Sequence, residues 1–439
     1  MPSRIINHIE TRTIEAAPLA VFRILFGFLL AAETGGAILT GWVRRAHVEP
    51  DFTFTFIGFE WLRMFNGPLM YGWFALMALL GIAVMLGWRY RWSLGAFTLL
   101  WTGSYLMQKA HYNNHYYLLI LLCLLMILAP AHAMASLDAR RDPRIRARRV
   151  PAWTRDMIIL LLAVVYTFAA LAKVQADWLT GHNVEVWFQA KKHYPIIGPG
   201  LQEPWIHGLV AWGGFLFDLL IVPALLWKRT RWLAVGASFV FHIFNSVVFQ
   251  VGIFPYLMLG ALVLFFPSEL IARRFFPKHK PEPLLSHSPS FRRWLAPLVV
   301  FFLLQMVLPL RHHLIPGDVN WTEEGHRMSW RMMLRYKHGR GKVWLKVPGE
   351  EKRELIPYRE HLTASQAGKL FSYPDFAWQY AQWLKKQRQQ EGIFPEIYFE
   401  SEVSLNGHAF QPLIDPEVDL AAAKWDYFGR NGWVLEMKE

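Results

Sequence analysis

Cysteine and charge are both scarce in this sequence. Cys123 is the only cysteine among 439 residues, so the chain cannot form an internal disulfide. Cysteine usage therefore does not distinguish an oxidising from a reducing compartment. Charged residues make up 18%, below the roughly 25% of soluble domains. The sequence has no phosphate-binding glycine loop, no serine-centred elbow and no dinucleotide fingerprint, so those enzyme classes find no support.

Long apolar runs fill the first two thirds of the chain instead. A helix needs about 20 apolar residues to cross the hydrocarbon core. The sequence predicts about nine such spans, and we read the first as a retained span and not as a cleaved signal. The nine are Ala17–Ile38, Leu69–Trp88, Trp92–Gln108, His115–Met134, Met157–Ala172, Ile206–Trp227, Trp232–Phe249, Gly252–Phe266 and Trp294–Leu310. The fifth and eighth are short.

The net charge of +13 reflects membrane topology. Lys and Arg concentrate in alternate loops, above all between Arg140 and Arg149, and cytoplasmic loops carry such an excess. This pattern predicts a cytoplasmic N-terminus and, after nine spans, a C-terminal part outside. The basic residues therefore give no reason to expect a nucleic-acid partner. The stretch His279–Pro289 is predicted to be a cytoplasmic linker rich in Pro, Ser and His.

The composition changes after residue 310. We predict a polytopic α-helical membrane domain over residues 1–310, followed by a soluble extracytoplasmic α+β or β-sandwich-like domain over 311–439. Four elements are expected there: strands Arg327–Tyr336 and Lys342–Val347 joined by a glycine turn, a helix over Thr363–Gln390, and a strand over Ile397–Leu405.

Polar side chains stand out at three places near the outer membrane face. They are the segment His111–Tyr117, Lys173 at the end of the fifth span, and His242 with Asn245 at the end of the seventh. Ionisable groups near hydrocarbon are costly, so each is a functional candidate. The Lys and Arg residues that indicate the membrane orientation lie in other loops. This orientation nevertheless brings all three polar places to the same membrane face.

Each candidate has an ordinary structural alternative. Lys173 is compatible with an interfacial lysine whose ammonium reaches the headgroups, although Tyr166 and small residues share its helix face. His115 is compatible with an aromatic belt, and His242 with a hydrogen-bonded core histidine. His111 and His115 have the spacing of paired ligands, but no carboxylate or Cys/His cluster accompanies them, so we predict no metal site.

Several segments resemble the vitamin K-dependent γ-glutamyl carboxylase family and its bacterial HTTM-domain relatives. They run from the first span to the C-terminal part: Leu19–Phe28, Asn113–Leu118, Ala172–Trp178, Phe241–Ser246, Gly252–Leu259, Asn320–Thr322, Ser329–Met333, Pro395–Phe399 and Ile414–Asp419. The short loops suit a bacterial inner membrane.

The resemblance implies an enzyme that couples oxygenation of vitamin K hydroquinone to γ-carboxylation of glutamate, with O₂ and CO₂ as co-substrates. It assigns Lys173 as the base, which must be neutral to accept a proton, and His115, Asn114 and His242 as supporting groups. Tyr166, Asn245, Trp330 and Arg331 are expected to bind substrate. The expected partners are membrane lipid, a lipid quinone and a Glu-containing protein or peptide.

Two alternatives stay open. One is a catalytically silent membrane scaffold or lipid/quinone carrier, which has no evident need for a lysine at position 173. The other is a haem electron carrier, which would show a Soret band.

Overall fold

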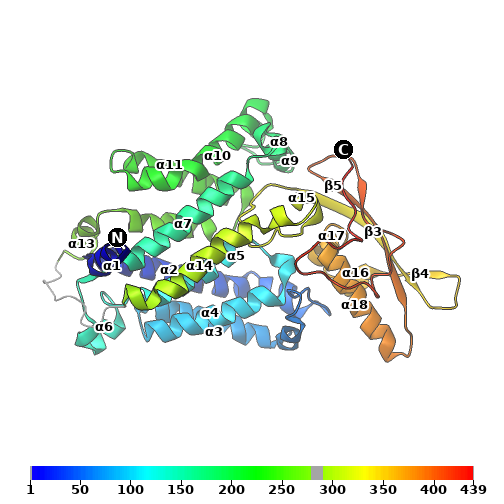
Figure 1. Ribbon diagram of the computed structural model, residues 1–439, viewed down its shortest axis with the longest axis horizontal. Helices are drawn as coiled ribbons and strands as arrows, with labels where there is room; N and C mark the ends of the chain where they lie inside the picture. The colour runs from blue at the N-terminus through cyan, green and yellow to red at the C-terminus, as the bar shows by residue number, and fades with distance from the viewer. Residues whose placement is uncertain (1, 278–289, 439) are drawn as a thin grey trace.

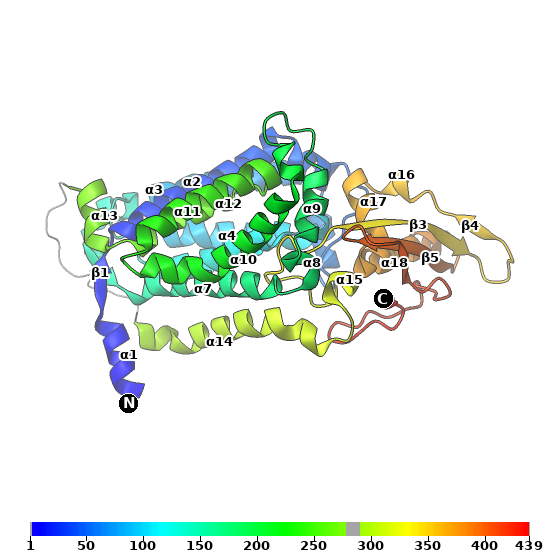
Figure 2. The ribbon, with the colours of Figure 1, turned by 90° about the horizontal axis from the view of Figure 1, so that it is seen from above.

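The computed structural model describes residues 2–277 and 290–438; the expected linker His279–Pro289 lies outside this range. A bundle of long helices forms most of the molecule, and a smaller part with a β-sheet caps one end of it (Figure 1). The view turned by 90° shows the same arrangement, with the N-terminal helix at the opposite end from the sheet (Figure 2).

A helix is found at each of the nine predicted places. The helices are α2 (Ala17–Leu39), α3 (Leu69–Leu86), α4 (Tyr90–Met107), α5 (Asn114–Leu128), α7 (Trp153–Ala172), α10 (Pro204–Leu226), α11 (Arg231–Phe244, continued by a π-turn to Phe249), α12 (Phe254–Ala261) and α14 (Phe291–Leu310). The fifth, expected to be short, has 20 residues.

The count of nine membrane spans is not confirmed. Six helices in the described part are long and apolar enough to cross a membrane, or up to seven if a bent pair counts as one span. The helix α5 has only 15 residues, because Ala129 becomes extended before Pro130. The eighth predicted span, Gly252–Phe266, holds the eight residues of α12 and a 3-10 turn that ends at Phe265, and the chain then bends by 108° into α13 (Ser268–Phe275).

Small residues let α2 and α3 approach closely. A Cβ at Gly81 would lie 2.6 Å from the backbone nitrogen of Ala31, and one at Gly27 would overlap the backbone of Met85. Close approach through small residues is a main source of helix association in lipid, where no hydrophobic effect drives it. These two glycines therefore set the packing of the first hairpin.

The part after Arg311 contains one antiparallel sheet in the order β4-β3-β5-β6. Its strands are β3 (Lys337–Lys346), β4 (Arg353–Leu355), β5 (Glu396–Leu405) and β6 (Gln411–Ile414). The helices α17 (Ala364–Leu370) and α18 (Pro374–Gln390) pack on it around a shared core that includes Phe376, Tyr380 and Phe399. The α+β prediction therefore describes this region, and the β-sandwich-like alternative does not.

Two local predictions for this region are wrong. The expected hairpin is absent, because residues 323–336 contain neither helix nor strand and β3 runs through the expected glycine turn. The predicted strand Lys342–Val347 is confirmed up to Lys346 as the second half of β3. The helix expected over Thr363–Gln390 is two helices that meet before Pro374, whose ring cannot continue the first one. The strand over Ile397–Leu405 is confirmed as part of β5.

Besides short turns of 3-10 and π-helix, the described part also contains short α-helices and strands. They are α1 (Pro2–Thr11), β1 (Thr13–Glu15), α6 (Leu137–Arg141), β2 (Arg149–Pro151), α8 (Ala176–Leu179), α9 (His182–Gln189), α15 (Val319–Thr322) and α16 (Tyr358–His361). The strands β1 and β2 pair with each other, and α6 lies at the end of the bundle far from the sheet (Figure 1). The arginine-rich segment and the C-terminal part are therefore at opposite ends of the molecule.

Candidate functional site

The three polar places lie together at the end of the bundle next to the sheet. Lys173 follows the last turn of α7, His115 is in the first turn of α5, and Asn245 follows the end of α11. Together with Tyr166 they line one cavity of about 850 Å³, whose other walls are mainly apolar side chains of α7, α10 and α11. A cavity of this size and composition is typical of a site for an apolar small molecule.

Lys173 is buried within this cavity wall and is ion-paired. Its Nζ donates to Asp218 Oδ2 of α10 at 2.6 Å and to the carbonyl oxygen of Ala169 at 3.2 Å. The side chains of Lys173 and Asp218 are 7% and 6% exposed. The ammonium also lies 5.1 Å from the ring centroid of Trp178. The alternative of a lysine that extends to the headgroups does not describe this side chain.

Asp218 is a site residue that the sequence analysis missed. It is the single carboxylate within the 23 residues of α10, whose remaining side chains are almost all apolar. An acidic residue in the middle of such a run is itself a functional signal, by the same argument that singled out Lys173. It lies outside the short segments on which the family resemblance rests.

Tyr166 and His242 form a second polar pair beside the first. The Tyr166 hydroxyl lies 3.1 Å from His242 Nε2, and His242 Nδ1 is buried without a hydrogen-bond partner. His242 does not itself line the cavity, and its polar contact with the cavity wall is the one to Tyr166. His115 stacks on Phe254 with 3.9 Å between ring centroids, which holds its imidazole at the cavity wall.

A second cavity of about 450 Å³ adjoins the first and has a more polar lining. The two share His115, Phe249 and Val251 from the bundle and Met332 and Met333 from the irregular segment 323–336. Five Lys and Arg side chains line this basic cavity: Lys109, Arg327, Arg331, Arg335 and Lys369. The apolar and the basic cavity therefore meet at His115.

Two buried carboxylates neutralise three of these cations. Asp375 accepts from Arg327 at 2.8 and 3.2 Å and forms an ion pair with Lys109. Arg335 donates to both oxygens of Glu323 at 2.5 Å. Burial alone would raise the pKa of Asp375, but Arg327 and Lys109 outweigh it and lower that pKa to about 2.

Arg331 and Lys369 have no carboxylate partner among the described residues. Arg331 donates through Nη2 to Asn320 Oδ1 at 3.1 Å, and its Nε is buried without a partner. Lys369 donates to the carbonyl oxygen of Ala110. Burial, with the charges of Arg327 and Arg335, lowers the pKa of Lys369 to about 8. These two cations leave the cavity with positive charge that no carboxylate among the described residues neutralises.

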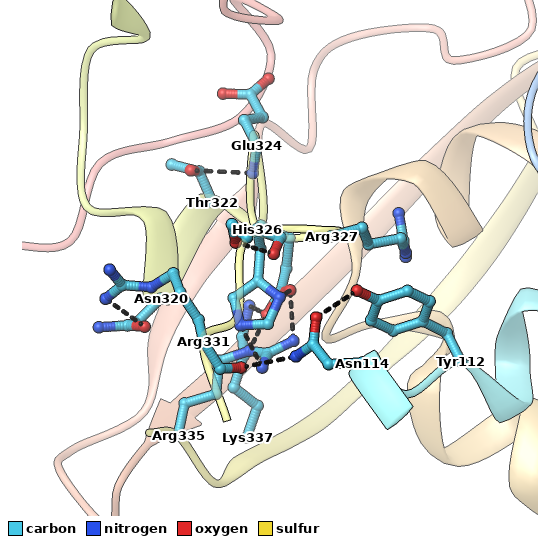
Figure 3. Close-up of polar contacts among 12 residues, drawn as sticks. Tyr112, Asn114, Asn320, Thr322, Glu324, His326, Arg327, Arg331, Arg335 and Lys337 are labelled. Carbon is cyan, nitrogen blue, oxygen red and sulfur yellow. Dashed lines mark hydrogen bonds and ion pairs between the residues drawn. The ribbon is translucent and has the colours of Figure 1, made fainter. Parts of the chain in front are cut away.

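Asn114 links the bundle to the segment above it. Its Nδ2 donates to the carbonyl oxygen of Arg331 at 3.1 Å, and its Oδ1 accepts from the Tyr112 hydroxyl at 2.8 Å (Figure 3). Tyr112 in turn accepts from the backbone nitrogen of Met328 at 2.6 Å. Asn114 therefore ties the backbone of Arg331 to the start of α5.

Trp330 lies apart from the other predicted site residues. Its side chain is 1% exposed, stacks on Tyr117 with 5.3 Å between ring centroids, and lines neither cavity. The backbone has a positive φ at Met328, Trp330 and Met333, which is uncommon for residues other than glycine. The structure thus places Trp330 as the buried anchor of a strained segment that carries Arg331 and Met332 into the cavities.

Two family models match the chain. The HTTM domain matches residues 11–269, which is more than half of it, and the vitamin K-dependent gamma-carboxylase lumenal domain matches residues 292–439. The chain belongs to the vitamin K-dependent gamma-carboxylase family. The matches cover the bundle with the apolar cavity and the part that closes the basic one. No solved structure matches the chain. Its apolar helices and this family make it a membrane protein.

Proposed function

We propose that this protein is a vitamin K hydroquinone-dependent oxygenase that couples epoxide formation to γ-carboxylation of glutamate in a protein or peptide. The observation that supports it most is the meeting of an apolar cavity, which holds the Lys173–Asp218 pair, with a basic cavity at His115. A coupled reaction needs an apolar redox substrate and an anionic acceptor side by side. The two cavities have the matching chemistry.

The apolar cavity fits a lipid quinone. Side chains of α10 and α11 that belong to its wall are also exposed on the outside of the bundle, among them Leu209, Val240 and Val247. In a bilayer this surface faces lipid, so a quinone with an isoprenoid tail enters laterally, without crossing water. The hydroquinone, when bound, supplies the reducing equivalents for O₂ and the strong base that removes the γ-proton of glutamate.

The residues of the chain then have separate tasks. Lys173 takes up a proton at Nζ or passes one on, and His115 orients oxygen atoms at the junction of the two cavities. Tyr166 and Asn245 contact the apolar substrate from opposite helices. In the basic cavity Arg331 and Lys369 hold the glutamate carboxylate, and Asn114 positions Arg331 through the hydrogen bond to its backbone. CO₂ meets the glutamate side chain at the junction.

The membrane orientation belongs to the same proposal. The arginine-rich segment and the sheet lie at opposite ends of the bundle, and a positive-inside arrangement puts the arginines in the cytoplasm. The N-terminus is then cytoplasmic and the C-terminal part extracytoplasmic. We assign the protein to a bacterial inner membrane.

The test adds chemically reduced vitamin K, labelled bicarbonate and a Glu-containing peptide to purified protein. Chromatography measures the epoxide, and the label measures carboxylation. Both products are expected. Epoxide without label would leave an oxygenase with another acceptor. Neither product, from protein that is folded and monodisperse, would move the assignment to a membrane scaffold or carrier.

A further inference from the structure

The contact between Lys173 and Asp218 raises a chemical question that rests on the proposed function. A lysine accepts a proton only as a neutral amine, because an ammonium has no free electron pair. A carboxylate 2.6 Å away favours the ammonium. In the ion pair of Lys173 and Asp218, the electron pair that can accept a proton therefore belongs to Asp218 and not to Lys173.

No third charged side chain among the described residues lines the cavity beside the Lys173–Asp218 couple. Lys173 and Asp218 are the charged side chains among the described residues that line the apolar cavity. The other titratable groups that face it are His115 of α5 and Tyr166 of α7, with His242 of α11 behind Tyr166. As an ion pair the couple has no net charge, so it can bind one proton and become a single cation.

We propose that the base of this site is the Lys173–Asp218 couple and not the lysine amine alone. One proton moves from Lys173 Nζ to Asp218 Oδ2 while Nζ receives the proton of a phenolic O–H. The electron pair of the broken O–H bond stays on the phenolic oxygen. Lys173 ends as an ammonium beside that oxygen, and Asp218 ends as a neutral carboxylic acid. The couple thus removes the proton and supplies the counter-ion in one step.

Asp218→Asn separates this scheme from a lone-amine base. The amide still accepts a hydrogen bond from Nζ but cannot take up its proton. We expect kcat for epoxidation to fall by about 100-fold or more, with KM for the hydroquinone little changed. Asp218→Glu, which keeps an acid, should recover part of the loss. If Lys173 works alone, Asp218→Asn removes the counter-ion that keeps it charged, and unchanged or higher activity would overturn the proposal.

A measurement without turnover keeps this test apart from that of the proposed function. Anaerobic vitamin K hydroquinone is added to the protein, and infrared difference spectra report the C=O stretch of a protonated carboxyl group. The band should appear in the wild type and be missing in Asp218→Asn. Its presence without epoxide under O₂ would overturn the proposed function only. Its absence, with epoxide formed, would overturn the couple.

A control variant for correct folding is available at the start of the same helix. Glu203→Gln removes an exposed carboxylate immediately before α10 and should leave both readouts unchanged. Quenching of tryptophan fluorescence measures whether Asp218→Asn binds hydroquinone, and binding shows that the cavity has formed. A variant that binds hydroquinone but lacks both band and turnover supports the couple. If Asp218→Asn does not bind, Asp218→Glu with wild-type binding and no band would overturn it.

Discussion

Lys173 and Asp218 illustrate how much single residues reveal. Lys173, His115 and His242 are visible in the sequence because polar groups near apolar runs are costly, and the structure brings them to one end of the bundle. Asp218 carries the same signal but lies outside the short segments that carry the family resemblance in the sequence. The partners of Arg331 were not predictable, because its position depends on an irregular backbone with positive φ at three nearby residues.

Replacement of the lysine is the first prediction. Lys173→Ala should abolish epoxide formation, a loss of at least about 100-fold, because no other charged donor in the described wall reaches the same place. Added small amines should restore part of the activity. Lys192→Ala, which removes an exposed lysine on the same side, is the matched control. Wild-type epoxidation by Lys173→Ala without added amine would contradict the role.

At the scale of elements, two glycines explain why the sequence predicts a hairpin turn where the structure has the continuous strand β3. Gly339 and Gly341 suggested a turn, yet both lie inside β3. A Cβ at Gly339 would meet Ser372, and one at Gly341 would overlap the carbonyl oxygen of Glu400 and crowd Phe371. Glycine in a strand often marks such a close approach. The sequence shows the glycines but not the chain segment that packs on them.

Gly341→Ala should therefore destabilise the C-terminal part. Overpacking of this kind costs about 1–3 kcal/mol, so its unfolding in urea should shift to lower concentration. Gly368→Ala is the matched change, since nothing lies within 4 Å of a Cβ there and alanine suits the helix α17 better than glycine. Equal stability of the two variants would show that Phe371 and Glu400 can yield.

At the scale of the whole molecule, orientation decides which compartment supplies the acceptor. Cys123 is buried, so an added cysteine acts as a specific reporter. Ser365→Cys, exposed in α17, should react with a membrane-impermeant maleimide in intact cells. Arg140→Cys, exposed in the arginine-rich segment, should react only after permeabilisation. The opposite pattern would place the sheet in the cytoplasm and the acceptor with it.

The two cavities also predict that the half-reactions can be separated. Lys173 belongs to the apolar cavity, whereas Arg331 and Lys369 belong to the basic one. The double variant Arg331→Gln/Lys369→Gln loses the two cations that have no carboxylate partner in the described structure. A hydrogen bond to a charged group contributes about 1.5–3 kcal/mol, which is roughly 10- to 100-fold in KM. The double variant loses two such groups, so KM for a Glu peptide should rise at least about 100-fold. Epoxidation should stay near the wild-type rate.

The pH dependence gives this prediction its second readout. Below a pKa of about 8 Lys369 is an ammonium that attracts a carboxylate, and above it the charge is lost. KM for the Glu peptide should therefore rise above pH 8 in the wild type, and that rise should weaken in Lys369→Gln while epoxidation does not follow it. Lys352→Gln, an exposed lysine in the same part, is the control. A parallel loss of both products in the double variant would mean that one shared site, and not two adjoining cavities, binds both substrates.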